Sequence, residues 1–131
     1  MLHLVWVQHL MNVQLARKLT AVLGFFGVLL GAFGAHALRP SLEAAAMVPV
    51  WQTAVLYHLV HAAALLGVTG QTAVSRLTFW SFFLGVVVFS GSLYLLALSR
   101  ISLLGAITPL GGFGMLLGWV SLLFAKRDKV R

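Results

Sequence analysis

The stretch LTFWSFFLGVVVFSGSLYLLAL, residues 77–98, contains no Asp, Glu, Lys or Arg. A helix needs roughly 20 consecutive apolar residues to cross the hydrocarbon core of a bilayer, which is about 30 Å thick. A helix also satisfies its own backbone hydrogen bonds, whereas an open strand in lipid would not. The stretch therefore predicts a transmembrane helix. Three further stretches share its length and lack of charge: residues 19–38, 48–68 and 103–125.

The composition agrees with a chain that lies mostly in lipid. Of the 131 residues, 61% are hydrophobic and 8% are charged, and the mean hydropathy is +1.03. A soluble domain carries about 25% charged residues, so this chain has too few charges to cover a water-exposed surface. The connections between the four stretches are short, so successive helices should be antiparallel. We predict an all-α polytopic membrane protein, a four-transmembrane-helix bundle in one domain of residues 19–125.

The basic residues predict the orientation of the four spans. An even number of spans places both ends of the chain on one side of the membrane. Arg39 and Arg100 fall on the opposite side. The side of the termini holds Arg17, Lys18, Arg76, Lys126, Arg127, Lys129 and Arg131. Because positively charged loops stay in the cytoplasm, both termini should be cytoplasmic. Because these basic residues lie at the ends of spans, the membrane orientation accounts for the net charge of +7, and no nucleic-acid partner is needed to explain it.

The two ends of the chain lie outside the predicted spans. Residues 1–18 are expected to form a cytoplasmic or interfacial segment, and residues 126–131 a basic cytoplasmic tail. Translation starting at Met1 and translation starting at Met11 both fit the first residues, so residues 1–10 need not be translated. Residues 11–37 also resemble a secretory signal that ends in AHA. The long apolar core and the glycine spacing argue against cleavage there.

Small residues recur at helical spacing within the spans. Such residues let helix backbones come close in lipid, where helices associate through van der Waals packing. The candidates for helix packing are Gly24, Gly27, Gly31, Gly34, Gly85, Gly91, Gly111, Gly114 and Gly118. They predict close packing within the bundle, with assembly between copies as the alternative. Pro109 is expected near the start of the fourth helix, where proline removes no helical hydrogen bond.

Few polar side chains within the spans can take part in chemistry. Ionisable groups inside a membrane are candidates for function. His36, Tyr57 and His61 form the candidate polar cluster, and Tyr57 and His61 share one helix face because they are four residues apart. His58 lies near His61 in the second span. A proton relay and a neutral, hydrogen-bonded structural cluster both fit these residues, and we expect His36 to lie nearer the membrane surface.

The sequence lacks the patterns of known catalytic and metal sites. It contains no cysteine, and its carboxylates are Glu43 and Asp128, both outside the spans. There is no HExxH, G-x-S-x-G or Walker motif. Three scattered imidazoles do not make a metal site of the usual geometry. We therefore expect no enzymatic activity, no metal and no cofactor.

Four motifs occur in the order found in one known family. They are LGAFGAH, YHLVHAAALL, FSGSLYLLALS and TPLGGFGMLLGW. Over about residues 17–125 the chain resembles the domain-of-unknown-function 423 family, small four-helix membrane proteins of bacteria with animal relatives called transmembrane protein 256-like. The matching motif positions are His36, Tyr57, His61, Ser90, Gly91, Ser92, Tyr94, Thr108, Pro109, Gly111 and Gly112. His58 and residues 1–10 fall outside the pattern.

The resemblance implies a multi-pass protein of the bacterial cytoplasmic membrane and transfers no biochemical activity. Two functions fit the residues. The first is a structural or accessory component that packs with itself or with a membrane complex, as the small residues suggest. The second is a small transporter or proton-coupled permease that uses Tyr57 and His61. Beyond the lipid bilayer, the expected partners are a second copy of the chain or another membrane protein.

Overall fold

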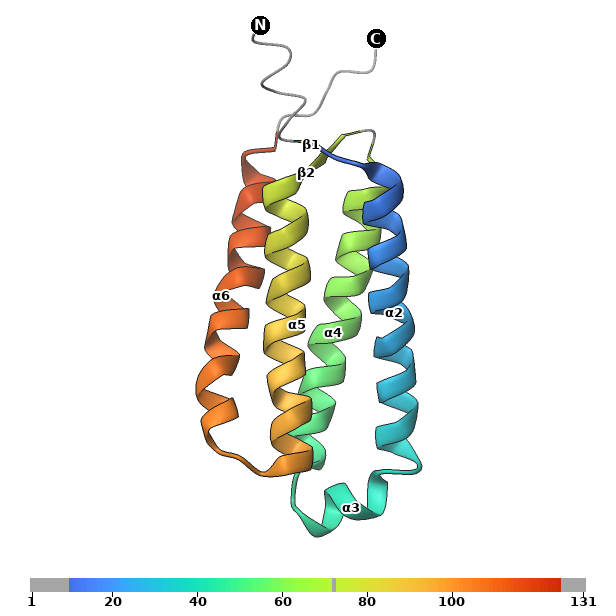
Figure 1. Ribbon diagram of the computed structural model, residues 1–131, viewed down its shortest axis with the longest axis vertical. Coiled ribbons are helices and arrows are strands. Elements are labelled where there is room, and N and C mark those ends of the chain that lie inside the picture. Colours follow the sequence, from blue (N-terminus) through green and yellow to red (C-terminus); the bar gives the residue numbers. More distant parts are fainter. Residues whose placement is uncertain (1–9, 72, 126–131) are drawn as a thin grey trace, which may run out of the picture.

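Four long helices make up most of the protein. The computed structural model describes residues 10–71 and 73–125. Its long helices are α2 (Val13–Ala35), α4 (Val48–Thr69), α5 (Arg76–Ser99) and α6 (Leu103–Leu123), each long and apolar enough to cross a membrane. They alternate in direction, so that α2 begins and α6 ends at the same end of the molecule (Figure 1). The prediction of an all-α protein with four membrane-spanning helices is confirmed.

The first helix differs from its predicted range of 19–38. It begins at Val13 because the side chain of Asn12 caps it and accepts hydrogen bonds from the backbone N–H groups of Gln14 (2.9 Å) and Leu15 (3.3 Å). Arg17 and Lys18 are therefore part of the helix and do not precede it. Of the two predicted terminal segments, residues 1–9 and 126–131 lie outside the described residues.

A short helix, α3 (Arg39–Ala44), joins α2 to α4 and was not predicted. Its first turn contains Pro40, which suits this position because proline has no N–H to donate. The side chain of Leu42 is buried and packs with Trp51 at the start of α4. α3 thus closes the end of the molecule opposite the beginning of α2 (Figure 1).

At the other end, two short strands tie the beginning of the chain to the loop before α5. β1 (Leu10–Met11) pairs antiparallel with β2 (Val74–Ser75), with Met11 opposite Val74. Both of these side chains are buried in a cluster that contains Leu65, Phe79 and Phe82. Ser75 then caps α5 with its side chain. The pairing explains why an apolar residue such as Met11 is buried before the first spanning helix begins.

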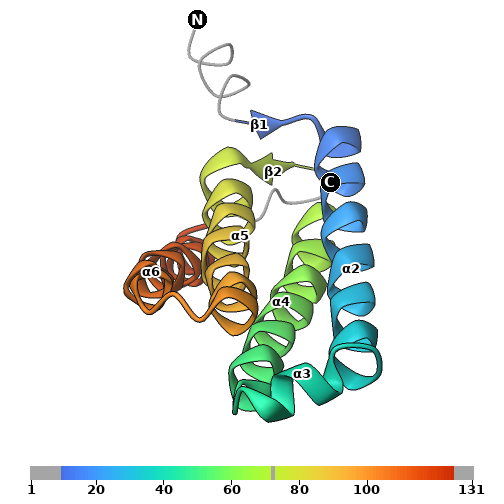
Figure 2. The same ribbon diagram turned by 60° about the horizontal axis from the view of Figure 1, so that its bottom comes forward.

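The four helices form a row in the order α2, α4, α5, α6. The main contacts between them are those of α2 with α4, α4 with α5, and α5 with α6. Figure 2 shows the same order from another direction, with α6 beyond α5 and far from α2. In the most apolar window of each inner helix, α4 and α5, 39% of the residues are buried, compared with 22% in α2 and α6. The two edge helices therefore have a smaller share of buried residues than the inner pair.

The glycines mark where the helices approach most closely. A Cβ added at Gly34 would lie 2.1 Å from the indole nitrogen of Trp51, and one at Gly27 would lie 2.7 Å from Leu59. In the contact of α5 with α6, a Cβ at Gly111 would lie 2.2 Å from the backbone nitrogen of Phe89. Similar close approaches occur at Gly31, Gly85, Gly114 and Gly118. These glycines pack helices within one molecule.

Two of the expected packing positions differ from the rest. A Cβ at Gly24 or Gly91 would meet nothing within 4 Å among the described residues. Helical spacing placed Gly24 in one stripe with Gly27, but the buried face of α2 runs through Thr20, Leu23, Gly27 and Gly34, and Gly24 lies beside it. The expected close approach is therefore absent at these two residues.

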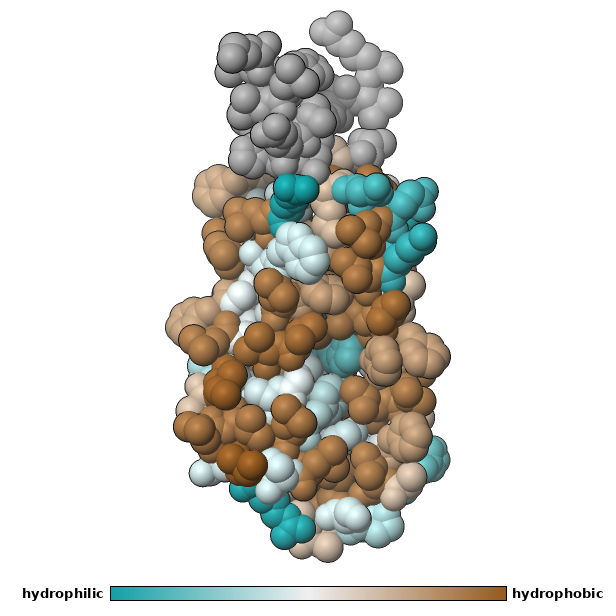
Figure 3. Space-filling view, viewed as in Figure 1, coloured by the Kyte–Doolittle hydropathy of each residue, from teal (hydrophilic) through white to brown (hydrophobic). Residues whose placement is uncertain are grey.

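The outer surface is apolar along most of its length. In the face shown in Figure 3, hydrophobic residues cover the middle, and the most hydrophilic residues gather near the two ends. Large exposed side chains include Phe25, Leu56, Leu66, Leu110 and Phe113, each at least 60% exposed. A surface of this kind fits lipid, since a soluble monomer rarely exposes so large an apolar patch.

Candidate functional site

The buried polar side chains of the spans include His58 on α4. Its Nε2 lies 2.7 Å from the backbone oxygen of Leu23 on α2, and its Nδ1 lies 3.0 Å from the hydroxyl oxygen of Tyr94 on α5. The imidazole is 5% exposed and the tyrosine is 8% exposed. His58 therefore connects three of the four long helices near the middle of the membrane, about 15 Å from the start of α4 by the helical rise.

The partners of His58 determine which ring nitrogen carries the proton. A backbone carbonyl can only accept, so Nε2 carries a hydrogen and donates it to Leu23. In the neutral ring Nδ1 then accepts, and the Tyr94 hydroxyl donates to it. Both ring nitrogens and the tyrosine hydroxyl are satisfied by one neutral tautomer. This arrangement holds the three helices together without placing a charge in the membrane.

His61 lies one turn further along α4 and contacts a different helix. Its Nδ1 lies 2.8 Å from the backbone oxygen of Tyr57, so this nitrogen donates. Its Nε2 accepts a hydrogen bond of 3.0 Å from the indole N–H of Trp119 on α6. The ring is 6% exposed and packs near Phe82. His61 thus uses the opposite tautomer to His58 and connects α4 to α6, which are not neighbours in the row.

Tyr57 is adjacent to His61 but is not buried with it. The two rings are stacked, with centroids 6.0 Å apart and planes 8° apart, and the other side of Tyr57 packs near Phe89. Its side chain is 40% exposed. Within the described residues its hydroxyl has no hydrogen-bond partner. Tyr57 therefore faces the edge of the α4–α6 contact, and His61 faces its interior.

His36 is far from this pair. It is the residue that ends α2, its backbone N–H donates to the carbonyls of Ala32 (3.1 Å) and Phe33 (3.3 Å), and it is exposed. His61 lies about 20 Å along α4 from the end of the molecule where His36 lies, by the helical rise. The structure brings Tyr57 and His61 together and leaves His36 at the surface, as its position beside Arg39 suggested.

Several serine, threonine and tryptophan side chains add hydrogen bonds between helices. Trp51 donates to the backbone oxygen of Leu30 at 2.9 Å, and Ser90 donates to that of Ala54 at 2.8 Å. Two hydroxyl pairs join α5 to α6: Ser92 with Thr108 (2.6 Å) and Thr78 with Ser121 (2.8 Å). Among the described residues, every buried polar side-chain atom has a partner. The buried polar groups of the spans are used for packing.

A groove of about 410 Å³ opens beside Tyr57 and His61. Its walls come from α4, α5 and α6 and include Phe89, Phe113 and Trp119. Pro109 also lines it and lies inside α6, not at the helix start where it was expected. A proline at this depth removes the hydrogen bond to the carbonyl of Gly105, four residues earlier. The groove is mostly apolar, with the Tyr57 hydroxyl and the edge of His61 as its polar features.

The histidines have little capacity for further chemistry in this arrangement. Both ring nitrogens of His58 and both of His61 already have partners, so neither ring offers a nitrogen to a metal or a substrate without breaking a helix contact. Residues 10–71 and 73–125 contain no group of three or more potential metal ligands. The site as built stabilises the helix arrangement.

The hydrogen bonds that His58, Trp51 and Trp119 make between helices were not predicted from the sequence. His58 lies outside the motif positions of the resembling family, yet both of its hydrogen bonds are buried. The two tryptophans have rings typical of the membrane interface, but their N–H groups contact other helices. The available signal was the three-residue spacing of His58 and His61, which places the two rings on adjacent sides of one helix.

Comparison with known proteins agrees with the membrane fold. The family described as "Protein of unknown function (DUF423)" matches residues 30–112. The UPF0382 membrane protein YwdK of Bacillus subtilis is 41% identical, over 82% of this chain and 91% of its own. UPF0382 membrane protein SH2409 of Staphylococcus haemolyticus is 46% identical, over 72% of this chain and 80% of its own.

A third relative comes from a different bacterial group. The UPF0382 inner membrane protein YgdD of Escherichia coli K12 is 44% identical over 79% of this chain and 82% of its own. No solved structure shows a significant match. The bacterial relatives are named as membrane or inner membrane proteins, in agreement with four apolar helices. The chain belongs to the DUF423 family of membrane proteins.

Proposed function

We propose that the protein is a non-enzymatic accessory component of the bacterial cytoplasmic membrane that associates through its edge helices with a second copy or with another membrane protein. The observation that carries this proposal is the open row of helices. α2 and α6 each pack against one main neighbour. Only 22% of the residues in the most apolar window of each of these helices are buried. A row of this kind offers two helix faces for lateral contacts.

The polar residues support the same proposal. Every buried polar side-chain atom among the described residues has a partner inside the molecule. The hydrogen bonds of His58 and His61 hold α2, α4, α5 and α6 in one arrangement and give the edge helices a rigid support. A preorganised surface loses less conformational freedom on association, which favours binding.

The edge of α6 is suited to a test because several of its large side chains are exposed, among them Leu110, Phe113 and Leu116. Phe113 is 69% exposed, whereas Phe82 on α5 is fully buried. A photo-crosslinking amino acid placed at Phe113 in living cells should give a protein–protein adduct, and mass spectrometry of the adduct should identify either a second copy or one defined membrane protein. The same probe at Phe82 should give crosslinks only within the chain.

The size of the assembly gives an independent check. The protein extracted in mild detergent should have a mass above the 14.2 kDa of one chain. A monomer in detergent, together with crosslinks from Phe113 to lipid alone, would contradict the proposal.

A second function has one observation in its favour, the groove of about 410 Å³ beside Tyr57 and His61. A permease would need titratable groups on a path near the middle of the membrane, and this mostly apolar groove reaches Tyr57 and His61. Liposomes containing the purified protein test it through proton flux, with His61→Gln as the matched variant, because glutamine keeps hydrogen bonds but does not titrate. We expect the flux to equal that of empty liposomes. A flux that the wild type shows and His61→Gln lacks would establish the permease instead.

A further inference from the structure

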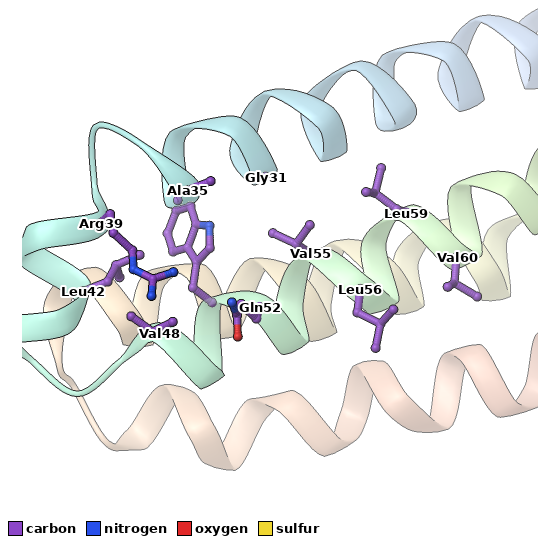
Figure 4. Close-up of a pocket in the computed structure, with 12 residues that line it drawn as sticks. Gly31, Ala35, Arg39, Leu42, Val48, Gln52, Val55, Leu56, Leu59 and Val60 are labelled. Atoms are coloured by element: carbon purple, nitrogen blue, oxygen red, sulfur yellow. The ribbon is translucent and has the colours of Figure 1, made fainter.

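A second groove lies between α2 and α4 at the α3 end of the molecule (Figure 4). It has a volume of about 350 Å³. Its floor and walls are apolar and follow one face of α4 through Val48, Val55, Leu59 and neighbouring residues. Gly31, Gly34 and Ala35 form the α2 side. The groove therefore runs along the helices from the membrane surface toward the interior.

The mouth of this groove is polar. Arg39 and Gln52 line it, and Figure 4 shows the Arg39 side chain extending toward the start of α4, where Gln52 lies. The Arg39 guanidinium bonds the Glu43 carboxylate through Nε. Among the described residues, the hydrogen bonds of Arg39 involve no other nitrogen of that group. Its two terminal nitrogens therefore have donors available at the mouth, which Arg39 lines.

Gln52 is unusual in its location. It is exposed on a helix face that otherwise carries Val55, Leu56 and Val60, and its amide makes no hydrogen bond with any part of the chain that the structure describes. By the helical rise it lies about 6 Å below the start of α4. An amide in that position would lie without a partner among lipid chains, so it needs one from outside the protein.

The depths of these groups match those of a phospholipid. The helix α4 has 22 residues, which span about 33 Å, close to the hydrocarbon thickness of a bilayer. Arg39 lies beyond the start of α4 and so falls in the interfacial layer, where lipid phosphates lie. Gln52 lies about 6 Å deeper than the start of α4, so its amide has to reach up toward the ester groups, and the apolar groove below it lies among the acyl chains.

We propose that the α2–α4 groove binds one phospholipid of the leaflet at the α3 end, with its phosphate on Arg39, an ester oxygen on Gln52 and one acyl chain along Val55, Leu56 and Leu59. Arginine suits a phosphate because its planar guanidinium presents several donors in a fixed geometry. The Glu43 carboxylate beside it offers a partner to a headgroup ammonium. The lipid is therefore a zwitterionic phosphatidylethanolamine.

Native mass spectrometry of the full chain in detergent tests the proposal. The probes are dioleoyl phosphatidylethanolamine, dioleoyl phosphatidylglycerol and dioleoylglycerol, which has the same chains but no phosphate. The wild type should bind phosphatidylethanolamine about tenfold more tightly than dioleoylglycerol, as expected for charge-assisted hydrogen bonds to the phosphate. Equal binding of these two probes would overturn the proposal, as would binding that occurs only with phosphatidylglycerol.

Two pairs of variants locate the binding site. Arg39→Gln should weaken phosphatidylethanolamine binding about tenfold and leave dioleoylglycerol unchanged, while Arg100→Gln, which changes the other arginine at this end, should have no effect. Leu56→Trp should fill the groove and weaken both probes, while Leu66→Trp, at a similarly exposed residue of α4 outside the groove, should have no effect. Thermal unfolding shows whether each variant folds.

A second variant and a competition experiment test the same site. If Arg39→Gln does not fold, Gln52→Leu tests binding of the same lipid through its ester oxygen, with an expected loss of about threefold, since a neutral hydrogen bond is weaker. Inorganic phosphate added as a competitor should not displace the lipid, because most of the groove contacts the chain. Displacement by inorganic phosphate, or equal effects of the variants at Arg39 and Arg100, would overturn the site.

Discussion

The hydroxyl oxygen of Tyr94 lies 3.0 Å from Nδ1 of His58, and both side chains are less than one-tenth exposed. This pair joins α5 to α4, and through Nε2 of His58 it also reaches α2. A hydrogen bond between helices is the main polar means of fixing their arrangement in lipid, where the hydrophobic effect does not bring helices together.

Removing this hydroxyl should destabilise the protein. We expect Tyr94→Phe to lower the free energy of unfolding by about 1 kcal/mol, because Nδ1 of His58 is left without its donor. A double-mutant cycle with His58→Phe should give a coupling energy of about 0.6 kcal/mol, and at most about 1.7 kcal/mol, as for other hydrogen bonds between membrane helices. Unfolding in mixed micelles with increasing dodecyl sulfate measures both values. Tyr57→Phe, whose hydroxyl lacks a partner among the described residues, serves as the control and should change little.

The glycine at the closest approach of α5 and α6 should not tolerate a methyl group. Gly111→Ala would place a Cβ 2.2 Å from the backbone nitrogen of Phe89, and backbone cannot move aside as a flexible side chain can. We expect a loss of about 1–3 kcal/mol in the free energy of unfolding, as for other overpacked interiors. Gly24→Ala, where a Cβ would meet nothing within 4 Å, should leave the midpoint of thermal unfolding unchanged. Equal effects of the two variants would show that α5 and α6 are further apart than described.

The hydrogen bond from Trp119 to His61 should contribute to the position of α6. Trp119→Phe keeps an aromatic ring beside Phe82 but removes the indole donor, so Nε2 of His61 loses its partner. We expect a loss of about 1 kcal/mol. Trp80→Phe is the matched control, since the Trp80 indole donates no hydrogen bond within the described residues. His61→Phe should also destabilise the protein, whereas His61→Gln should preserve folding because the amide oxygen can still accept from Trp119.

The orientation of the chain in the membrane follows from its charges and stays a prediction. Reporter fusions should place the connections at Arg39 and Arg100 outside the cytoplasm, and those at Arg76 and the C-terminal tail inside. Reversing the charge bias tests the cause: replacing Arg17 and Lys18 by glutamine should reduce the fraction of molecules in that orientation. An external reporter signal at Arg76 in the unchanged chain would contradict the prediction.

The sequence by itself determined the four spanning helices and their alternating direction. Long stretches without charge leave a helix as the only structure that satisfies the backbone in lipid. Because there are four such stretches, the first helix begins and the last helix ends at the same end of the molecule. The ranges of α4, α5 and α6 differ little from those predicted. α2 differs because the Asn12 cap lies outside the apolar stretch, and α3 was missed because six residues carry too little periodicity to be detected.

Which residues meet across helices was decided only by the tertiary structure. In a soluble helix the apolar side identifies the buried face, but in lipid the side facing the bilayer and the side facing other helices are both apolar. Helical spacing therefore showed that His58 and His61 point in different directions, and gave no way to assign His58 to Leu23 and Tyr94 or His61 to Trp119. The order of the helices in a row, the open space beside Gly24 and Gly91, and the exposure of Tyr57 depend on the same packing. In it, the close approach of glycines to Trp51 and Phe89 sets the neighbours of each helix.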